Sequence, residues 1–348
     1  MPAAPDRPDG TGTHADPDAE TAALRTGAGA FSAHRDVIAV RGPDVESYLQ
    51  GQLSQNVAAL AVGAAKDALL LQPDGKLAAL LRVTRTDGQG FLLDVEGGYG
   101  SSVAERLRRF LLRTKVELEQ LDWRCLCLRG QAVKDTAAGM LAVLAERGVL
   151  TLPFEWNGWA GVDVLGPGDT VLDTSRLPEG IVPCGPAPVE ACRIASGIPA
   201  MGAELTEKTI AAEAGLVERT VDFDKGCYTG QELVARINAR GSNVARRLVG
   251  VMAADAGQGR EPLARGMTLH AGEAPTGDDP AADKVVGTVT SAAWSSELRA
   301  QIALAYLHRS VRTPGLVRVR SGDGTGGSRP ARVAPLPLVG VEAAPRPG

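Results

Sequence analysis

Aromatic residues are scarce in this chain of 348 residues, at 4%, and histidine occurs only four times. Few rings are therefore present to stack on nucleic-acid bases. The 37 Lys and Arg residues are outnumbered by 41 Asp and Glu residues, which gives a formal net charge of −4. Because a broad nucleic-acid-binding surface needs excess positive charge, we expect no direct nucleic-acid partner.

Cysteines and long hydrophobic runs are also few. An odd number of cysteines in a chain of this length indicates a reducing compartment rather than a disulfide framework. No window approaches the roughly 18 unbroken apolar residues of a membrane helix, and the acidic, proline-rich first 20 residues lack the apolar segment of a signal peptide. We therefore expect a cytoplasmic protein without a membrane partner. The five cysteines are Cys125, Cys127, Cys184, Cys192 and Cys227.

The length and a hydrophobic content of 44% allow two or three domains. Composition predicts disordered tails over residues 1–28 and 339–348. Between them, apolar spacing predicts a short helix after Asp44, an antiparallel meander over residues 68–96 and a helix over 100–112 with Ser102 as its cap. A second unit of short strands and helices begins near residue 115, and from Arg246 onward strands dominate. The pattern predicts an α+β protein that ends in a β-domain.

Residues 221–241 combine a thiol, a lysine and a helix start. Thr229 followed by Glu232 has the spacing of a capping box, which predicts a helix that begins at Gly230. Cys227 then lies just outside a helix N-terminus with Lys225 two residues away, and both features favour a thiolate. In the alternative interpretation, Cys227 is a small buried hydrophobe and Gly226 and Gly230 are turn glycines.

Cys125 and Cys127 are interpreted differently from Cys227. The strand period of two places both side chains on one face. A metal would need two further ligands, and no histidine lies nearby in the sequence. We interpret this segment as a core strand and predict no metal site.

The segment KGCYTGQE, residues 225–232, resembles the signature of the YgfZ family of folate-binding proteins, which are related to the aminomethyltransferase T-protein of glycine cleavage. Further segments share the resemblance, which spans residues 36 to about 338. These segments are RGPDVESYLQGQLSQNV, LLLQPDGK, RTKVEL, RIASGIP, ARINARGSN and VGTVTSA.

The resemblance implies an aminomethyltransferase-like ring of three domains around a folate-sized channel. Two mixed α/β, ferredoxin-like domains would cover residues 29–114 with 205–242 and residues 115–204, and a C-terminal β-barrel would cover 243–338. The implied function is to assist iron–sulfur cluster assembly or repair in client enzymes, including those that thiomethylate tRNA. The implied cofactor is tetrahydrofolate or a one-carbon derivative, and relatives of this kind are often monomers.

The resemblance also assigns roles at the site. Cys227 would be the reactive thiol, Lys225 would stabilise its anion, and Gln231 and Glu232 would order the loop. Gly226 and Gly230 would let the backbone approach the channel. Tyr228 either stacks on a flat ring or packs in the core. Arg236 and Arg240 either meet the glutamate tail of a folate or form a solvated helix face, and Asn56 stands where relatives often carry an aspartate.

Three positions depart from the catalytic branch of these relatives. Paired aspartates that contact the reacting folate nitrogen are replaced by Ala78 and Ala79, and a glutamate that holds the pterin is replaced by Ala195. Without these carboxylates we do not expect a classical aminomethyltransferase. A folate-dependent one-carbon transferase and a thiol redox or cluster scaffold remain as alternatives.

Overall fold

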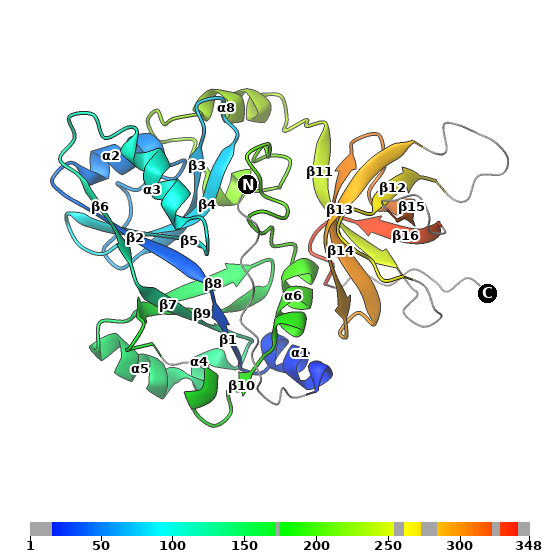
Figure 1. Ribbon diagram of the computed structural model, residues 1–348, viewed down its shortest axis with the longest axis horizontal. Coiled ribbons are helices and arrows are strands. Elements are labelled where there is room, and N and C mark those ends of the chain that lie inside the picture. The colour runs from blue at the N-terminus through cyan, green and yellow to red at the C-terminus, as the bar shows by residue number, and fades with distance from the viewer. Residues whose placement is uncertain (1–15, 172–173, 254–260, 273–283, 322–327, 340–348) are drawn as a thin grey trace.

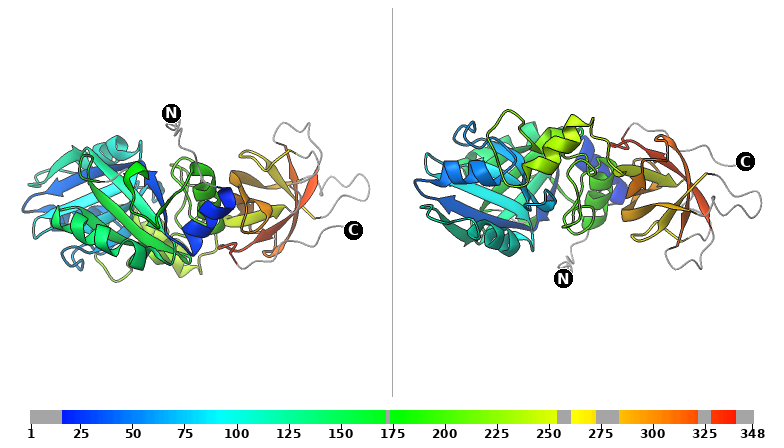
Figure 2. Two further views of the ribbon diagram at one scale, coloured as in Figure 1. Left: turned by 90° about the horizontal axis from the view of Figure 1, so that it is seen from below. Right: turned by 90° about the horizontal axis from the view of Figure 1, so that it is seen from above.

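The computed structural model describes residues 16–171, 174–253, 261–272, 284–321 and 328–339. Figure 1 shows three parts: two β-sheets with their helices at one end and a β-barrel at the other. Figure 2, which views the molecule from below and from above, shows that it is elongated, with the barrel beyond α6. The predicted α+β organisation with a C-terminal β-barrel is confirmed. None of the described helices has the length and apolar character needed to span a membrane.

The first sheet has five strands in the order β3-β4-β5-β2-β6, and every neighbouring pair is antiparallel. Without the edge strand β3, this is the ferredoxin-like order, with one helix after β2 and one after β5. The strands are β2 (Arg35–Arg41), β3 (Ala65–Leu71), β4 (Leu77–Arg85), β5 (Gly90–Glu96) and β6 (Glu117–Leu121), and the helices are α2 (Val45–Gln52) and α3 (Gly100–Arg108).

Helix α3 is shorter than predicted. It ends at Arg108; beyond it Leu111 still packs against the core of the first sheet, whereas Leu112 is 85% exposed. Ser102 does not cap the helix, because its hydroxyl donates to the Tyr99 carbonyl.

The second sheet has the order β10-β1-β7-β9-β8. Strand β1 pairs antiparallel with β7 and parallel with β10, so the start of the chain completes the second sheet. The elements are β1 (Gly29–Ala33), β7 (Trp123–Arg129), β8 (Leu150–Trp156), β9 (Trp159–Pro167) and β10 (Val182–Pro183), the helices α4 (Val133–Thr136), α5 (Ala138–Glu146) and α6 (Pro186–Ala195), and the 3-10 turn Thr174–Arg176.

These pairings correct the predicted boundary between the first two units. The prediction placed residues 29–33 in the first domain and residues 117–121 in the second. In the structure, β1 lies in the second sheet and β6 pairs with β2 in the first. The length and polarity of β1 and β6 do not indicate which of the two sheets each strand joins. The sequence pattern therefore did not distinguish the two arrangements.

The predicted N-terminal disorder is wrong for residues 16–28. Helix α1 (Pro17–Arg25) begins after Asp16, whose side chain accepts a hydrogen bond from the Asp18 amide. Leu24 is fully buried, and its carbonyl accepts a hydrogen bond from the Trp159 indole. Ala23 and Leu24 pack with Trp159 and Cys192, and these apolar contacts hold a segment whose overall composition is polar. Residues 1–15 and 340–348 lie outside the described residues.

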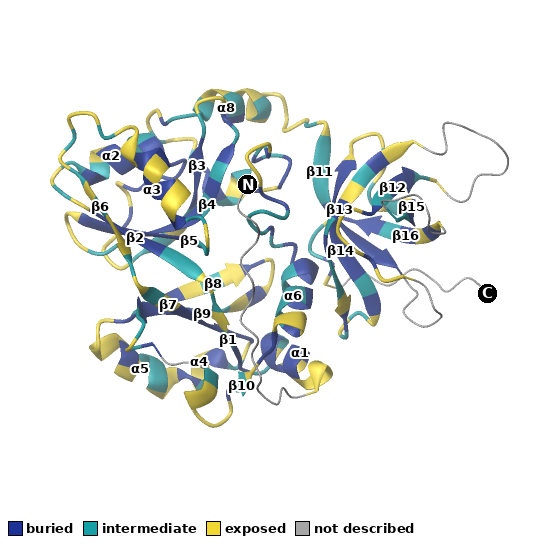
Figure 3. Cartoon of the chain, viewed as in Figure 1, coloured by how far each residue is buried: buried dark blue, intermediate teal, exposed yellow. Residues whose placement is uncertain are grey.

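The barrel closes through the strand order β11-β14-β13-β12-β15-β16. Figure 3 shows that buried residues line its strands and the side that faces α6. Ile194 and Ala195 of α6 pack there against Leu304 and Leu338. The strands are β11 (Arg246–Ala253), β12 (Thr268–Ala271), β13 (Val285–Ser295), β14 (Ala300–His308), β15 (Gly315–Arg320) and β16 (Arg329–Ala334). The remaining helices are α7 (Val217–Thr220) and α8 (Gln231–Ala239).

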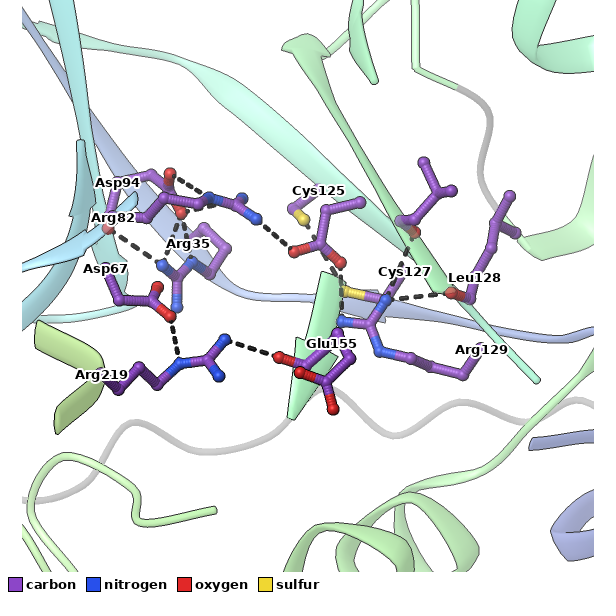
Figure 4. A network of polar contacts seen from close by, with 12 residues as sticks. Arg35, Asp67, Arg82, Asp94, Cys125, Cys127, Leu128, Arg129, Glu155 and Arg219 are labelled. Atoms are coloured by element: carbon purple, nitrogen blue, oxygen red, sulfur yellow. Dashed lines mark hydrogen bonds and ion pairs between the residues drawn. The ribbon is translucent and has the colours of Figure 1, made fainter. Parts of the chain in front are cut away.

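A buried ionic network joins the two sheets (Figure 4). Arg82 of β4 donates to Asp94 of β5 at 2.9 Å and to Asp163 of β9 at 2.7 Å. Arg129 of β7 donates to the other Asp163 oxygen at 2.7 Å. Burial alone would raise the pKa of Asp163, but the two guanidinium groups outweigh it and hold that pKa well below its ordinary value. Asp163 is therefore a shared anion between two cations.

We expect Asp163→Ala to lower the free energy of unfolding by about 3–5 kcal/mol, because it leaves two buried guanidinium groups without this partner. Urea unfolding at pH 7 measures the difference, with the exposed Asp122→Ala as the control. Since the pKa of Asp163 is depressed, its contribution is complete above the unfolded carboxyl pKa of about 4 and declines at lower pH. A difference between the two variants below 1 kcal/mol would contradict the role of Asp163.

Candidate functional site

Lys225 is fixed against the C-terminal end of α2. Its ammonium donates to the carbonyls of Gln50, Leu53 and Gln55 at 2.6, 2.6 and 3.0 Å. The final carbonyls of a helix have no partner within the helix, and a cation there also interacts favourably with the helix dipole. The lysine therefore ties the signature segment to the first domain.

This geometry bears on the role predicted for Lys225. An ammonium group has three donor hydrogens, and the three carbonyls account for all of them. None remains to bond directly to a Cys227 thiolate. Burial lowers the pKa of Lys225 to about 8, although nearby Asp222 acts in the opposite direction. The lysine supports the loop that carries the thiol.

Cys227 is exposed, whereas the other four cysteines are buried. The alternative of a small buried hydrophobe is therefore wrong for this residue. The predicted capping box is also wrong. Helix α8 begins at Gln231 after Gly230, without a side-chain cap. The Thr229 amide instead donates to the Gly51 carbonyl at 3.0 Å, and the Gln231 side chain accepts a hydrogen bond from the Tyr228 amide at 3.2 Å.

The two signature glycines differ in their surroundings. Gly230 has a φ of 83°, and a Cβ atom there would lie 2.5 Å from the Gln72 carbonyl oxygen. Gly226 is exposed, and a Cβ there would meet no described atom within 4 Å. Gly230 thus allows the loop to pack on the turn between β3 and β4, whereas Gly226 makes no close backbone approach to the described residues.

Tyr228 packs in the core. It is buried in a cluster that includes Leu69, Leu77 and Trp156, and the Lys225 ammonium lies 5.0 Å from its ring centroid. Burial raises the pKa of Tyr228 to about 12. Of the two alternatives for this ring, the structure shows the core position.

The other predicted residues do not converge on the thiol. Asn56 accepts a hydrogen bond from the Gln50 side chain at 3.1 Å, so it lies beside the carbonyls that hold Lys225. Glu232 and Arg236 are exposed on α8, and Arg240 is exposed directly after its last residue. No hydrogen bond or ion pair joins these three side chains to the loop within the described residues, as in the solvated helix face that was one of the two alternatives.

A cavity of about 550 Å³ lies next to the signature loop. Its described lining comes from both sheets and from the segment that precedes Lys225, without a barrel residue. Sequence reasoning did not find these residues, and the only cue was the charged run just before KGC. The lining consists of Gln55, Ala65, Lys66, Asp67, Arg82, Pro153, Phe154, Glu218, Arg219, Val221, Asp222, Phe223 and Asp224.

The arginines in the cavity wall are already paired. Arg82 belongs to the buried network, and Arg219 donates to Asp67 at 2.5 Å and to the Glu155 carbonyl at 2.6 Å (Figure 4). Arg219 also lies 4.1 Å from the ring centroid of Trp156. Both guanidinium groups serve as structural parts of the wall.

Cys125, Cys127 and Asp163 place possible metal ligands within 4.8 Å of one another. The arrangement does not suit a cation, because Asp163 is bound by Arg82 and Arg129. The hydrogen bond with Cys125, together with burial, holds the pKa of Cys127 well above its ordinary value, which opposes the thiolate that a metal requires.

Comparison with solved structures identifies the fold. The glycine cleavage system aminomethyltransferase T from Bartonella henselae superposes with a TM-score of 0.72 at 20% sequence identity, over 93% of this chain and 90% of that chain. The fold is aminomethyltransferase-like. Residues 246–339 also match the family model of the glycine cleavage T-protein C-terminal barrel domain, which corresponds to the observed barrel.

Similar sequences carry two kinds of name. An aminomethyltransferase of Rubrobacter xylanophilus is 29% identical over 92% of this chain and 85% of its own length. An iron-sulfur cluster assembly factor IBA57 homolog, mitochondrial, of Pyricularia oryzae is also 29% identical, over 60% of this chain and 53% of its own length. The aminomethyltransferase-like fold therefore connects this chain to proteins of two different named functions.

We expect Lys225→Met to change how stability depends on pH. The unfolded chain holds the Lys225 proton up to an ordinary pKa of 10.5, whereas the folded chain releases it near 8. Lys225 thus makes the free energy of unfolding rise as pH increases from about 8 to 10.5. Urea unfolding across this range should show a smaller slope for Lys225→Met than for the wild type or the exposed Lys134→Met. Equal slopes would contradict the assignment.

Gly230→Ala should destabilise the protein by about 1–3 kcal/mol, because alanine resists a positive φ and its Cβ would collide with the Gln72 carbonyl. Gly226→Ala is the matched control from the same loop, and we expect a change below about 0.5 kcal/mol. Thermal unfolding followed by circular dichroism measures both variants. Similar losses in the two would show that the packing of Gly230 on the turn is unimportant.

Proposed function

We propose that this chain is a folate-binding factor that assists iron–sulfur cluster assembly or repair in client enzymes and does not catalyse classical aminomethyl transfer. The observation that carries the proposal is the exposed Cys227 on a loop whose neighbouring Lys225 is bound by three backbone carbonyls. A thiol presented in this way is accessible to a partner protein. Similarity to the Pyricularia oryzae assembly factor supports the same function.

The positions that would carry carboxylates in the catalytic branch support the second half of the proposal. Ala79 and Ala195 are 0% and 1% exposed, and each packs in an apolar cluster. Ala78 packs against the first of these clusters. None of the three side chains can exchange a proton. A positioned acid or base typically contributes about 10² to 10⁴ in rate, so transfer by this route would be slow.

The cavity beside the signature loop is large enough for a folate. Its volume lies within the range of small-molecule sites, about 300–1,000 Å³. The lining offers carboxylates and an ammonium for the polar edges of a ligand, and Phe154 and Phe223 for its flat rings. Folate, when bound, carries one-carbon units. We propose that the lining holds it while Cys227 stays accessible outside the cavity.

The aminomethyltransferase alternative has one observation in its favour, which is the similarity to the Rubrobacter xylanophilus enzyme over 92% of this chain. A turnover assay with the partner proteins of glycine cleavage distinguishes the two functions. We expect no aminomethyl transfer above background, whereas turnover at the rate of a true aminomethyltransferase would establish the alternative.

The first test is anaerobic calorimetric titration of tetrahydrofolate into the wild type and into Cys227→Ser. We expect both to bind with affinities within about three-fold, because Cys227 is not part of the cavity lining. Binding by the wild type alone would place the thiol in the pocket. Absence of binding by both would refute the folate half of the proposal.

The second test addresses the thiol. In cells that depend on this protein, Cys227→Ser should reduce the activity of iron–sulfur enzymes, whereas Cys192→Ser, which alters a buried thiol, should do so only as far as it lowers protein abundance. Activity of the client enzymes is measured relative to the amount of folded protein. Full function of Cys227→Ser would remove the thiol from the proposal.

A further inference from the structure

The turn that follows α3 exposes apolar and cationic side chains together. Phe110 is 38% exposed, and Leu112, at 85%, is the most exposed large hydrophobic side chain among the described residues. Arg108, Arg113 and Lys115 are exposed in the same segment. No ion pair occupies these three cations within the described part of the chain. We refer to these five residues as the α3 surface.

The end of the helix does not by itself account for this arrangement. A cation in the last turn interacts favourably with the helix dipole, which explains Arg108. Arg113 and Lys115, however, lie beyond the last helical residue, and Arg113 has a φ of 63°. Leu111 packs against the core of the first sheet and anchors the turn, while Leu112 stays outside. The apolar and basic side chains are therefore presented by an anchored segment.

The buried Arg106 links the α3 surface to the signature loop. Its guanidinium lies 4.1 Å from the ring centroid of Phe110 and donates to the Leu71 carbonyl at 2.7 Å. The signature loop packs on the same residue, because a Cβ at Gly230 would lie 2.8 Å from the Leu71 Cβ. Cys227 lies three positions before Gly230. The exposed thiol and the exposed ring thus flank the same end of β3.

A second connection runs through α2. Arg106 also donates to the side-chain oxygen of Gln52 at 3.2 Å. The adjacent Gly51 carbonyl accepts the hydrogen bond from the Thr229 amide of the signature loop at 3.0 Å. A protein bound to the α3 surface would therefore lie beside the accessible Cys227.

Charge indicates which kind of partner this surface fits. The whole chain has a formal net charge of −4, so a local group of unpaired cations selects an acidic surface of limited size. Exposed Glu105 and Glu117 border the segment on its two sides. These carboxylates would repel a wide polyanion such as a nucleic acid or an anionic membrane. An acidic protein surface with an apolar centre is the better match.

We propose that the α3 surface docks an acidic, partly apolar face of the iron–sulfur client protein that Cys227 serves. Phe110 and Leu112 supply the apolar centre of the interface, and the three cations supply its charged rim. The inference rests on the proposed function, and it specifies where the client binds and the chemistry of the client surface.

The test uses the purified apo form of an iron–sulfur enzyme whose activity falls in cells that carry Cys227→Ser. Its affinity for the immobilised full-length protein is measured by biolayer interferometry. We expect the double variant Arg108→Glu with Arg113→Glu to bind about 10- to 100-fold more weakly, because like charges would then face each other. We expect Leu112→Ser to bind about 3- to 10-fold more weakly, because it removes apolar contact area.

Salt dependence and matched controls separate docking from a structural effect. Added salt should weaken wild-type binding more than binding by the double variant, because salt screens exposed charges. Val143→Ser on α5 and Arg147→Glu directly after it change an exposed apolar residue and an exposed cation of the second unit, and both should bind like the wild type. Thermal unfolding confirms that every variant is folded. In cells, the double variant should lower client activity relative to the amount of folded protein.

Each result supports or overturns the proposal. Client binding that is unchanged in the double variant and in Leu112→Ser, or no measurable binding by the wild type, refutes the α3 surface, while the proposed function stands on the effect of Cys227→Ser. If Cys227→Ser leaves every client activity unchanged, the proposed function and this inference both fail. Binding of transfer RNA or of phosphatidylcholine–phosphatidylglycerol vesicles that only the double variant loses, with client binding retained, would assign the surface to a polyanion and overturn the inference.

Discussion

The shared carboxylate of Asp163 is the interaction on which the arrangement of the two sheets depends. It binds Arg82 of the first sheet and Arg129 of the second, and Arg82 continues to Asp94. Removing charged groups from water is costly, and this cost is recovered only when each charge meets a partner in good geometry. The sheets are therefore bound to one relative position, and the cavity whose wall includes Arg82 takes its shape from that position.

A second constraint acts at the end of α2. Backbone carbonyls of residues 50–55 need donors, and the signature segment supplies them through Lys225 and Thr229. Gly230, which has a positive φ, lets the turn into α8 pack closely against the Gln72 carbonyl. The conformation of the loop that carries Cys227 is thus fixed by these hydrogen bonds and by the packing of Gly230, while the thiol itself is exposed to solvent.

Local patterns predicted much of the fold. The meander of β3 to β5 follows from alternating apolar residues between turn residues such as Gly75, and the barrel follows from repeated short strands. The pairing of strands was less predictable, because the sequences of β1 and β6 do not indicate which sheet each strand joins. At the site, KGCYTGQE located the loop, but the capping box failed because Thr229 satisfies a carbonyl of α2 instead of the first turn of α8. Cavity residues such as Asp67 and Arg219 lie 152 positions apart and become neighbours only through tertiary packing.

The position of β1 has a consequence for how the protein is made. This strand leaves the ribosome early but pairs with β7, about one hundred residues later, and with β10, later still. The whole first sheet lies in the sequence between β1 and β7, and its core also needs α8, which follows the second sheet. Neither unit is a continuous stretch of chain. Neither can therefore be completed until residues that follow part of the other unit in the sequence have been synthesised. Such long sequence separations between contacts slow folding, and the strands of both sheets keep unpaired edges until residue 239 has been synthesised.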